Sequence, residues 1–260
     1  MSFATAQDGT KIYYETYGDG KPVLFIHGGG GNTIVWYQQV PIFSETHKVI
    51  VMDLRGFKSS VCPTERIHPR YFPGDVLAIL DQERIEKISL VCDSLGAWAG
   101  VPLAVRNPER VHSLFISGSP TPIYSEKTWD ILKTAAQTFD NGGDDLRSKS
   151  IGWNRKKINP TVLYLYGRLK ALNPKGFKAL TMQSDDVKIY PSDLIGYSVP
   201  TLMTGGSHDD FLTPDIHHLA TELIPGCKSY TFQDAGHFPY FETPDEFNSV
   251  LARFLEEQRW

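Results

Sequence analysis

The alternation of hydrophobic and polar positions changes character near residue 20. Before that point, residues 3–17 alternate on both sides of Asp8-Gly9, a dipeptide typical of hairpin turns, and so predict two antiparallel strands. After it, short apolar runs alternate with stretches of helical periodicity: residues 23–26, 49–52, 88–91, 114–116, 201–203 and 230–232. Runs of this length separated by helices predict βαβ units. We therefore expect a doubly wound α/β fold, with a mostly parallel, eight-stranded sheet and helices on both faces.

Small and polar residues follow each of these apolar runs. Examples are His27-Gly28-Gly29, Asp53-Leu54-Arg55 and Asp93-Ser94. Because ligands of open α/β sheets bind at the carboxyl ends of the strands, we expect these loops to converge on one site.

Residues 121–197 interrupt this rhythm. They contain helical stretches, such as 129–139 and broken pieces near 175–182, but no clear buried strand. We therefore expect a core made of residues 1–120 and 198–260, with a helical insertion, 121–197, lying over the strand ends. The aromatic residues of the insertion together favour an apolar roof over the site: Trp129, Trp153, Tyr164, Tyr166, Phe177 and Tyr190.

The carboxyl-terminal region predicts one more helix. Thr243-Pro244-Asp245-Glu246 has the form of a helix start, with an N-cap, a proline at the first position and a capping-box glutamate. The following apolar positions lie on one helix face: Phe247, Val250, Leu251, Phe254 and Leu255. This helix is expected to anchor the loop that carries His237.

Composition narrows the classes of function. The chain has 260 residues, 41% hydrophobic and 22% charged, as is typical of a globular protein. A net charge of −4 without a basic stripe argues against binding of nucleic acid. No apolar run is long enough to span a bilayer and the amino terminus has no secretory pattern, so we expect a cytoplasmic protein that does not bind membranes. The three cysteines, Cys62, Cys92 and Cys227, are expected to be free thiols.

Ser94 stands where the apolar run 88–91 breaks off and a helical pattern begins. A strand, a tight turn and a helix would hold its hydroxyl at the apex, beside free N–H groups and the positive end of the helix dipole, a geometry that suits acyl transfer. The Ser-x-Gly triplet alone is weak, because Ser150-Ile151-Gly152 has the same form without a preceding strand. The context favours Ser94.

Five motifs in the same order resemble the α/β-hydrolase superfamily over nearly the whole chain. They are His27-Gly28-Gly29-Gly30-Gly31, Asp53-Leu54-Arg55-Gly56-Phe57-Lys58-Ser59-Ser60, the turn at Ser94, Asn107-Pro108-Glu109-Arg110-Val111, and Gly236-His237-Phe238 leading to Glu242-Thr243-Pro244. The resemblance implies a nucleophile, acid and base in the order Ser94, then Asp209 or Asp210, then His237. It also implies that the insertion is a helical cap.

Two residues depart from the family pattern. Cys92 stands where the turn usually has glycine, and Asp93 directly precedes Ser94, which raises the alternative of a carboxylate nucleophile, as in dehalogenase relatives. In similar sequences a turn of this form ends the helix after the nucleophile, and the number of residues from Ser94 to the turn at Asn107 matches that spacing, which favours the serine over Asp93.

The acid is less well defined. Counting forward from Pro200 and Gly206, as the resemblance suggests, favours Asp209, while counting back from Thr213-Pro214 allows Asp210, and we expect Asp209. Among the eight histidines, His237 has the position of a base and His27 that of a structural residue, whereas His208, His217 and His218 are expected at the surface.

These expectations define a site without metal or cofactor. His237 would take the proton of Ser94 while Asp209 fixes its tautomer, and the N–H groups of Gly29 and Leu95 would form the oxyanion hole. Substrate contacts are expected from Gly30, Trp36, Asp93, Trp129, Trp153 and Phe238.

The resemblance implies a cofactor-independent serine hydrolase that cleaves a carboxylic ester or lactone of a small or medium apolar molecule through an acyl-enzyme. One alternative is another enzyme on the same triad: a C–C bond hydrolase, lyase, synthase or cofactor-free haloperoxidase. A second alternative is a slow-turnover ligand receptor. The sequence leaves the substrate open, and it allows an oligomer.

Overall fold

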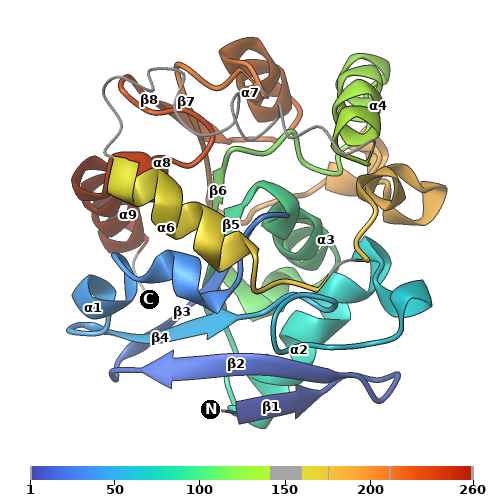
Figure 1. The fold of residues 1–260 in the computed structure, drawn as a ribbon. Coiled ribbons are helices and arrows are strands. Elements are labelled where there is room, and N and C mark those ends of the chain that lie inside the picture. Colours follow the sequence, from blue (N-terminus) through green and yellow to red (C-terminus); the bar gives the residue numbers. More distant parts are fainter. Residues whose placement is uncertain (1, 141–159, 175, 211, 259–260) are drawn as a thin grey trace.

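The structure is a computed structural model that describes residues 2–140, 160–174, 176–210 and 212–258 (Figure 1). Its centre is an eight-stranded sheet in the order β1-β2-β4-β3-β5-β6-β7-β8. The strands are β1 (Ser2–Thr5), β2 (Lys11–Tyr17), β3 (Lys21–Ile26), β4 (His47–Met52), β5 (Ile88–Asp93), β6 (Val111–Ser117), β7 (Thr201–Gly206) and β8 (Lys228–Phe232). The pairs β1·β2 and β2·β4 are antiparallel, and all other pairs are parallel. The predicted hairpin, the six apolar runs and the doubly wound fold are confirmed.

Helices cover both faces of the sheet (Figure 1). One face carries α2 (Phe72–Gln82), α3 (Ala97–Arg106) and α7 (Pro214–Glu222), and the other carries α1 (Val40–Phe43), α8 (Pro239–Glu242) and α9 (Pro244–Glu257). Side chains of each strand alternate between the two cores. In β3, Leu24 and Ile26 enter the core beneath α2 and α3, while Val23 and Phe25 enter the core beneath α9.

The described part of the segment between β6 and β7 is helical, as expected. It contains α4 (Glu126–Asp140), α6 (Pro160–Lys170), η6 (Ala179–Gln183), η7 (Asp185–Val187) and η8 (Pro191–Leu194). Helix α4 matches the prediction for 129–139, whereas the predicted pieces near 175–182 are reduced to the short η6. The remaining 3-10 turns are η1 (Thr33–Trp36), η2 (Thr64–Arg66), η3 (Pro69–Tyr71), η4 (Ser94–Gly96) and η5 (Pro108–Arg110).

Helix α9 is present and begins as predicted, with Thr243 at the N-cap and Pro244 at the first position, but the predicted capping-box hydrogen bonds are absent. Thr243 makes no capping hydrogen bond; its Oγ1 donates to the carbonyl of Pro239 at 3.3 Å, because the same residue also ends α8. Glu246 accepts instead from the hydroxyl of Tyr230 at 2.7 Å. The predicted apolar face of α9 is buried, so packing rather than the capping box holds this helix in place.

Ser94 lies at the turn between β5 and α3, with a left-handed φ of 45°. The turn presses against β3, since a Cβ added at Gly96 would lie 2.5 Å from the carbonyl oxygen of Ile26. Two residues before Ser94, the thiol of Cys92 faces Gly100 of α3 so closely that a Cβ at Gly100 would overlap its Sγ. The small residue that lets β5 and α3 approach each other is therefore Gly100 on the helix. Its lack of a side chain makes room for Cys92 on the strand.

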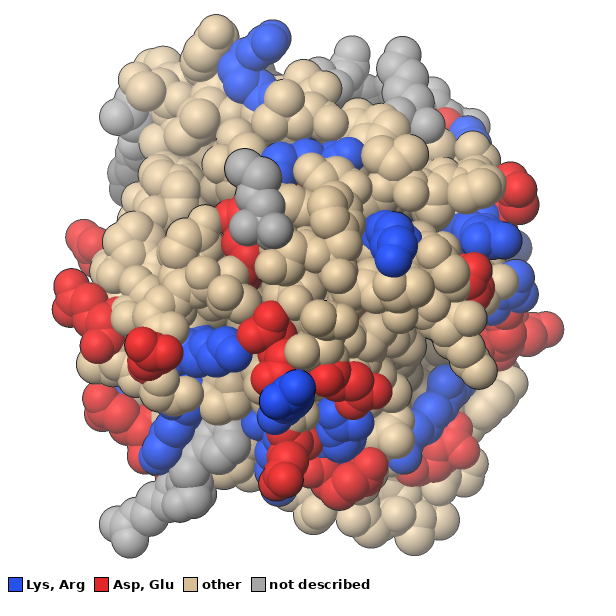
Figure 2. Space-filling model, turned by 90° about the horizontal axis from the view of Figure 1, so that it is seen from below, with Lys and Arg blue, Asp and Glu red and all other residues tan. Residues whose placement is uncertain are grey.

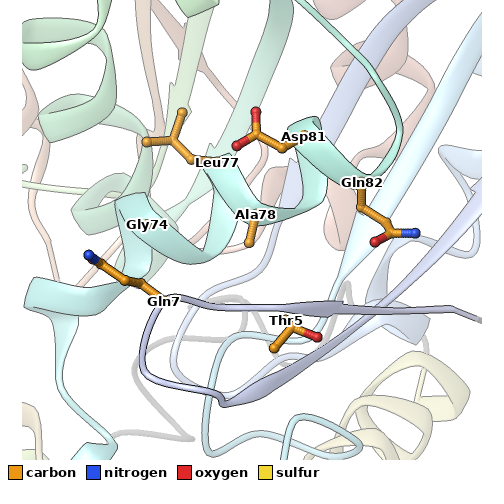
Figure 3. Close-up of a pocket in the computed structure, with 7 residues that line it drawn as sticks. All are labelled: Thr5, Gln7, Gly74, Leu77, Ala78, Asp81 and Gln82. Carbon is orange, nitrogen blue, oxygen red and sulfur yellow. The ribbon is translucent and has the colours of Figure 1, made fainter.

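A groove of about 560 Å³ lies between the first hairpin and α2 (Figure 3). Its lining residues are Thr5, Gln7, Gly74, Leu77, Ala78, Asp81 and Gln82. None of them was expected to belong to the functional site. Seen from below, the acidic and basic side chains are interspersed, so this face presents no extended surface of one charge (Figure 2). No helix in the described ranges is long and apolar enough to cross a membrane.

The contact between Cys92 and Gly100 is testable by stability. Gly100→Ala should lower the free energy of unfolding by about 1 kcal/mol, because the overlap outweighs the gain in helix propensity. In the Cys92→Ala background the same change should cost nothing or stabilise. Gly167→Ala is the matched control, since this helical glycine has nothing within 4 Å of an added Cβ. Denaturant unfolding of the unsubstituted protein, the three single variants and the double variant measures these differences, and an equal cost of Gly100→Ala with and without the thiol would contradict this packing.

Candidate active site

Three polar side chains from separate loops meet at the carboxyl ends of the central strands. Ser94 follows β5, Asp209 follows β7 and His237 follows β8. His237 Nδ1 lies 2.7 Å from Asp209 Oδ2, and His237 Nε2 lies 3.2 Å from Ser94 Oγ. The structure therefore brings together the three residues expected to act as nucleophile, acid and base.

The hydrogen bonds assign the atoms of His237. A carboxylate accepts, so the Nδ1–H donates to Asp209 and leaves Nε2 as the acceptor that faces the serine hydroxyl. Burial disfavours the imidazolium, but the charge of Asp209 outweighs it and raises the pKa of His237. Burial likewise disfavours the Asp209 carboxylate, and the facing imidazoles of His237 and His217 overcome this and hold the pKa of Asp209 well below its usual range. Asp209 is thus suited to stay charged beside a buried imidazole.

The neighbouring Asp210 occupies a different environment. Asp209 is 1% exposed and bonded to the histidine, whereas Asp210 is exposed. Asp209 also accepts the backbone N–H of Leu212 at 2.8 Å through its other oxygen. The geometry selects Asp209 as the partner of His237.

His217 was expected at the surface, and this prediction is wrong. It is buried, and its Nε2 lies 3.8 Å from Asp209 Oδ2, on the carboxylate oxygen that His237 also contacts. The ring reaches this position because α7 packs on β7 at Gly205, where an added Cβ would lie 2.6 Å from the ring. His218, the next residue on the helix, is exposed as expected.

Residues 28–31 form a turn directly above Ser94, closed by a hydrogen bond from Gly31 N–H to the Gly28 carbonyl at 3.0 Å. A Cβ added at Gly28 would lie 3.0 Å from the Cβ of Ser94. One added at Gly29 would reach Leu95 at 3.9 Å, so the two expected oxyanion residues are neighbours. We call residues 28–31 the glycine loop.

His27 holds the start of the glycine loop. Its Nδ1–H donates to the Gly28 carbonyl at 2.7 Å, and its Nε2 accepts the N–H of Leu54 at 3.0 Å. Burial lowers the pKa of His27, which suits the neutral ring that these two bonds require. The structural role expected of this histidine is confirmed.

Asp93 lies behind Ser94 and under the glycine loop. It is 0% exposed, its Oδ2 lies against Gly28 and accepts from the Tyr240 hydroxyl at 3.4 Å. Within the described structure its Oδ1 has no hydrogen-bond partner. Burial raises the pKa of Asp93 to about 7, although the charge of His237 and hydrogen bonds from Tyr240 and Gly28 act in the opposite direction. Because this side chain is fully buried, a substrate cannot contact it. Asp93 lies beneath the site and not, as expected, on the surface that would bind a substrate.

The other expected substrate contacts fall in different places. Gly30 and Phe238 lie at the site, where Phe238 packs on the ring of His237 at a centroid distance of 4.7 Å. Trp129 is half-buried and packs on Tyr124 at 5.6 Å. Trp36 is fully buried between Phe25 and Tyr240, and so has no exposed surface with which to contact a substrate. Trp153 lies outside the described residues.

The expected aromatic roof is only partly present. Tyr166 and Phe177 contact the glycine loop, since an added Cβ would overlap the Tyr166 hydroxyl at Gly30 and meet the Phe177 ring at 3.9 Å at Gly29. Tyr164 and Tyr190 are 72% and 45% exposed, and the ring of Tyr190 packs on Tyr124 at 5.6 Å. The aromatic enclosure near Ser94 is therefore made by a few residues of the inserted segment.

Glu242 is a site residue to which the sequence analysis gave no role. Its two oxygens accept the N–H groups of Gly236 at 3.0 Å and Phe238 at 2.9 Å, on either side of His237. Burial raises its pKa, with the two N–H groups acting against this. The sequence feature that could have pointed to Glu242 is its place in the motif that begins at Gly236.

No group of three His, Cys, Asp or Glu side chains within the described ranges is placed to hold a metal ion.

The family model described as alpha/beta hydrolase fold matches residues 21–244. The chain belongs to the α/β-hydrolase family. The pimeloyl-(acyl-carrier protein) methyl ester esterase of Aliivibrio salmonicida is 27% identical to this hydrolase over 96% of its chain and 97% of the relative. The 2-hydroxy-6-oxononadienedioate/2-hydroxy-6-oxononatrienedioate hydrolase 2 of Pseudomonas putida is 24% identical, covering 98% and 96%. A solved enzyme that degrades N-acyl homoserine lactones superposes with a TM-score of 0.82 at 27% identity, covering 97% of this hydrolase and all of that chain.

The charge of Asp93 should be visible in the titration of His237. An ionised Asp93 raises the pKa of the histidine, so Asp93→Asn should make His237 lose its proton at a lower pH than in the unsubstituted hydrolase. Asp210→Asn is the control, because that carboxylate is exposed and should leave the titration unchanged. NMR of the ring protons across pH 5–9 measures both. An unchanged or higher midpoint in Asp93→Asn would refute the electrostatic coupling.

Proposed function

We propose that the chain is a cofactor-independent serine hydrolase that cleaves a carboxylic ester or lactone of a small or medium apolar molecule through an acyl-enzyme. The observation that carries this proposal is the continuous chain of contacts from Asp209 through His237 to Ser94. A serine hydroxyl is a poor nucleophile by itself, and a neutral imidazole acceptor at 3.2 Å is the arrangement that can activate it.

The mechanism follows from these positions. Ser94 Oγ attacks the carbonyl carbon while its proton passes to His237 Nε2, and Asp209 stabilises the imidazolium that forms. The carbonyl oxygen becomes an oxyanion, held by the N–H groups of Gly29 and Leu95. When the tetrahedral intermediate collapses, the C–O bond breaks and His237 returns the proton to the leaving alkoxide. Water, deprotonated by the same imidazole, then attacks the acyl-enzyme and releases the acid and Ser94.

The surroundings of Ser94 support an apolar substrate. Leu95, Phe177 and Tyr166 contact the glycine loop, and Phe238 packs on both His237 and Tyr166. Relatives named as a methyl ester esterase and as a lactone-degrading enzyme fit the same choice. We further propose that residues 121–197 act as a cap over a core of residues 1–120 and 198–260. The cytoplasmic location stays a prediction.

A second candidate is hydrolysis of an oxo-dienoate. Relatives that are 24–25% identical to this chain are named as hydrolases of such compounds. The same serine and base could serve it. Turnover of oxo-dienoates, with no turnover in a graded series of esters and lactones, would replace the leading proposal with this one.

Covalent labelling tests the nucleophile. A fluorophosphonate should modify Ser94 alone, because the bound imidazole activates that hydroxyl, and peptide mass spectrometry identifies the modified residue. Ser94→Ala should remove the label. An unmodified Ser94 under conditions that label a control esterase would reject the proposal, as would modification of Ser150.

Substitution of the two neighbouring aspartates tests the acid. Asp209→Asn should lower kcat for an ester by roughly 10³- to 10⁴-fold, because the amide no longer holds the required tautomer of His237. The adjacent and exposed Asp210→Asn is the matched control and should change kcat by less than about 2-fold. Steady-state kinetics decides the matter, and the reverse order of effects would transfer the role to Asp210.

A further inference from the structure

The carboxyl-terminal end of α6 lies against the glycine loop, although the two are about 140 residues apart in the chain. The side-chain amide of Asn173, in the turn after α6, donates to the Gly31 carbonyl at 2.9 Å and reaches the Gly30 carbonyl at 3.4 Å. Figure 1 shows α6 passing over the strand ends on the side where β3 and β5 end. One amide group thus spans two successive carbonyls of the loop.

A second asparagine fixes the first. Asn32, directly after the loop, is fully buried, and its Nδ2 donates to the Leu169 carbonyl of α6 at 2.9 Å and to Asn173 Oδ1 at 3.2 Å. Its own Oδ1 accepts the N–H of Ile34 at 3.1 Å, which sets the amide orientation. We call this pair, Asn32 and Asn173, the asparagine latch.

The glycine loop needs such an outside support. Its residues have no side chains with which to fix their own peptide planes, and the glycines serve close approach: Gly28 to Ser94, Gly30 to Tyr166 and Gly31 to His27. His27 holds the first carbonyl of the loop, at Gly28. The carbonyls at the far end, on Gly30 and Gly31, are held by Asn173.

We propose that Asn173 is a positioning residue: by holding the carbonyls of Gly30 and Gly31, the asparagine latch fixes the far end of the glycine loop, restrains through it the Gly28–Gly29 peptide that carries the Gly29 N–H, and so ties the oxyanion hole to helix α6. This proposal rests on the proposed function, which assigns the Gly29 N–H to the oxyanion. A donor that is misplaced by a fraction of an ångström stabilises a developing charge less, so the effect falls on the transition state rather than on substrate binding.

The test compares Asn173→Ala with Asn248→Ala. Asn248 is buried whereas Asn173 is half-buried; it too donates to a backbone carbonyl, that of Gln38 at 3.4 Å, and it accepts from Gln39 at 3.0 Å, but it lies in α9 and has no hydrogen bond to the glycine loop. Its loss should cost at least as much stability without altering the loop. Asn173→Asp adds a variant of unchanged shape in which the donor is replaced by an acceptor.

Two measurements are made on all four proteins. The first is the rate of fluorophosphonate labelling of Ser94, together with kcat and KM on an ester. Asn173→Ala and Asn173→Asp should slow labelling and lower kcat by about 10-fold with KM nearly constant, a fraction of the 10²- to 10³-fold loss for a deleted oxyanion donor. The second is hydrogen exchange of the loop amides, which should accelerate in both Asn173 variants and stay unchanged in Asn248→Ala.

The outcomes separate this proposal from the proposed function. Reactive Ser94 in every protein at equal rates would overturn the positioning role and leave the serine hydrolase intact. If the labelling rate falls equally in the Asn173 variants and in Asn248→Ala, the positioning role is also overturned, since general destabilisation would then explain the slower labelling. If Ser94 of the unsubstituted protein does not react, the proposed function fails, and hydrogen exchange alone then decides the role of Asn173. Unchanged exchange of the loop amides in Asn173→Ala would overturn the latch as well. Faster exchange would support it.

Discussion

The left-handed backbone at Ser94 is the constraint on which the site depends. A side chain at φ 45° costs on the order of 1 kcal/mol, and it persists only where the surrounding structure leaves the turn no alternative. Here β3 presses on the turn at Gly96, and the glycine loop closes over Ser94 from above. The backbone approach is tight enough that any side chain at Gly96 or Gly28 would displace it, so the position of the hydroxyl follows from packing in the sheet.

The glycine loop shows how a segment without side chains is positioned by others. His27 holds the Gly28 carbonyl from the strand, Asp93 lies beneath the loop, and Asn173 holds its far end. Each of these groups is buried or half-buried, and each comes from a different element. The loop is therefore sensitive to the core and to the inserted segment alike, which connects the segment between β6 and β7 to the proposed chemistry at Ser94.

The features that could be predicted from the sequence are those that depend on residues close together in the chain. Short apolar runs identified the strands, and the turn residues after them identified Ser94 and His237 and favoured Asp209. What it did not predict depends on contacts between distant segments: His217 was expected at the surface because nothing in its own helix reveals that Gly205 leaves room for its ring. The latch formed by Asn173 likewise has no local signature. The sequence placed the start of α9 at Thr243 correctly but not its hydrogen bonds, because the hydroxyl of Thr243 bonds to the preceding short helix instead.

The charges of Asp209 and Asp93 both raise the pKa of His237, but the pKa values of these two carboxyl groups are themselves shifted in opposite directions. Asp209 has a lowered pKa and carries a charge, which stabilises the imidazolium when the proposed base takes a proton. If Asp93 were also fully ionised, its charge would raise the pKa of His237 further and disfavour the neutral imidazole that accepts from Ser94. Complete burial instead raises the pKa of Asp93 to about 7, so that much of this second charge is absent near neutral pH. An acidic residue directly before the proposed nucleophile is compatible with a neutral base because it is buried with few hydrogen-bond donors.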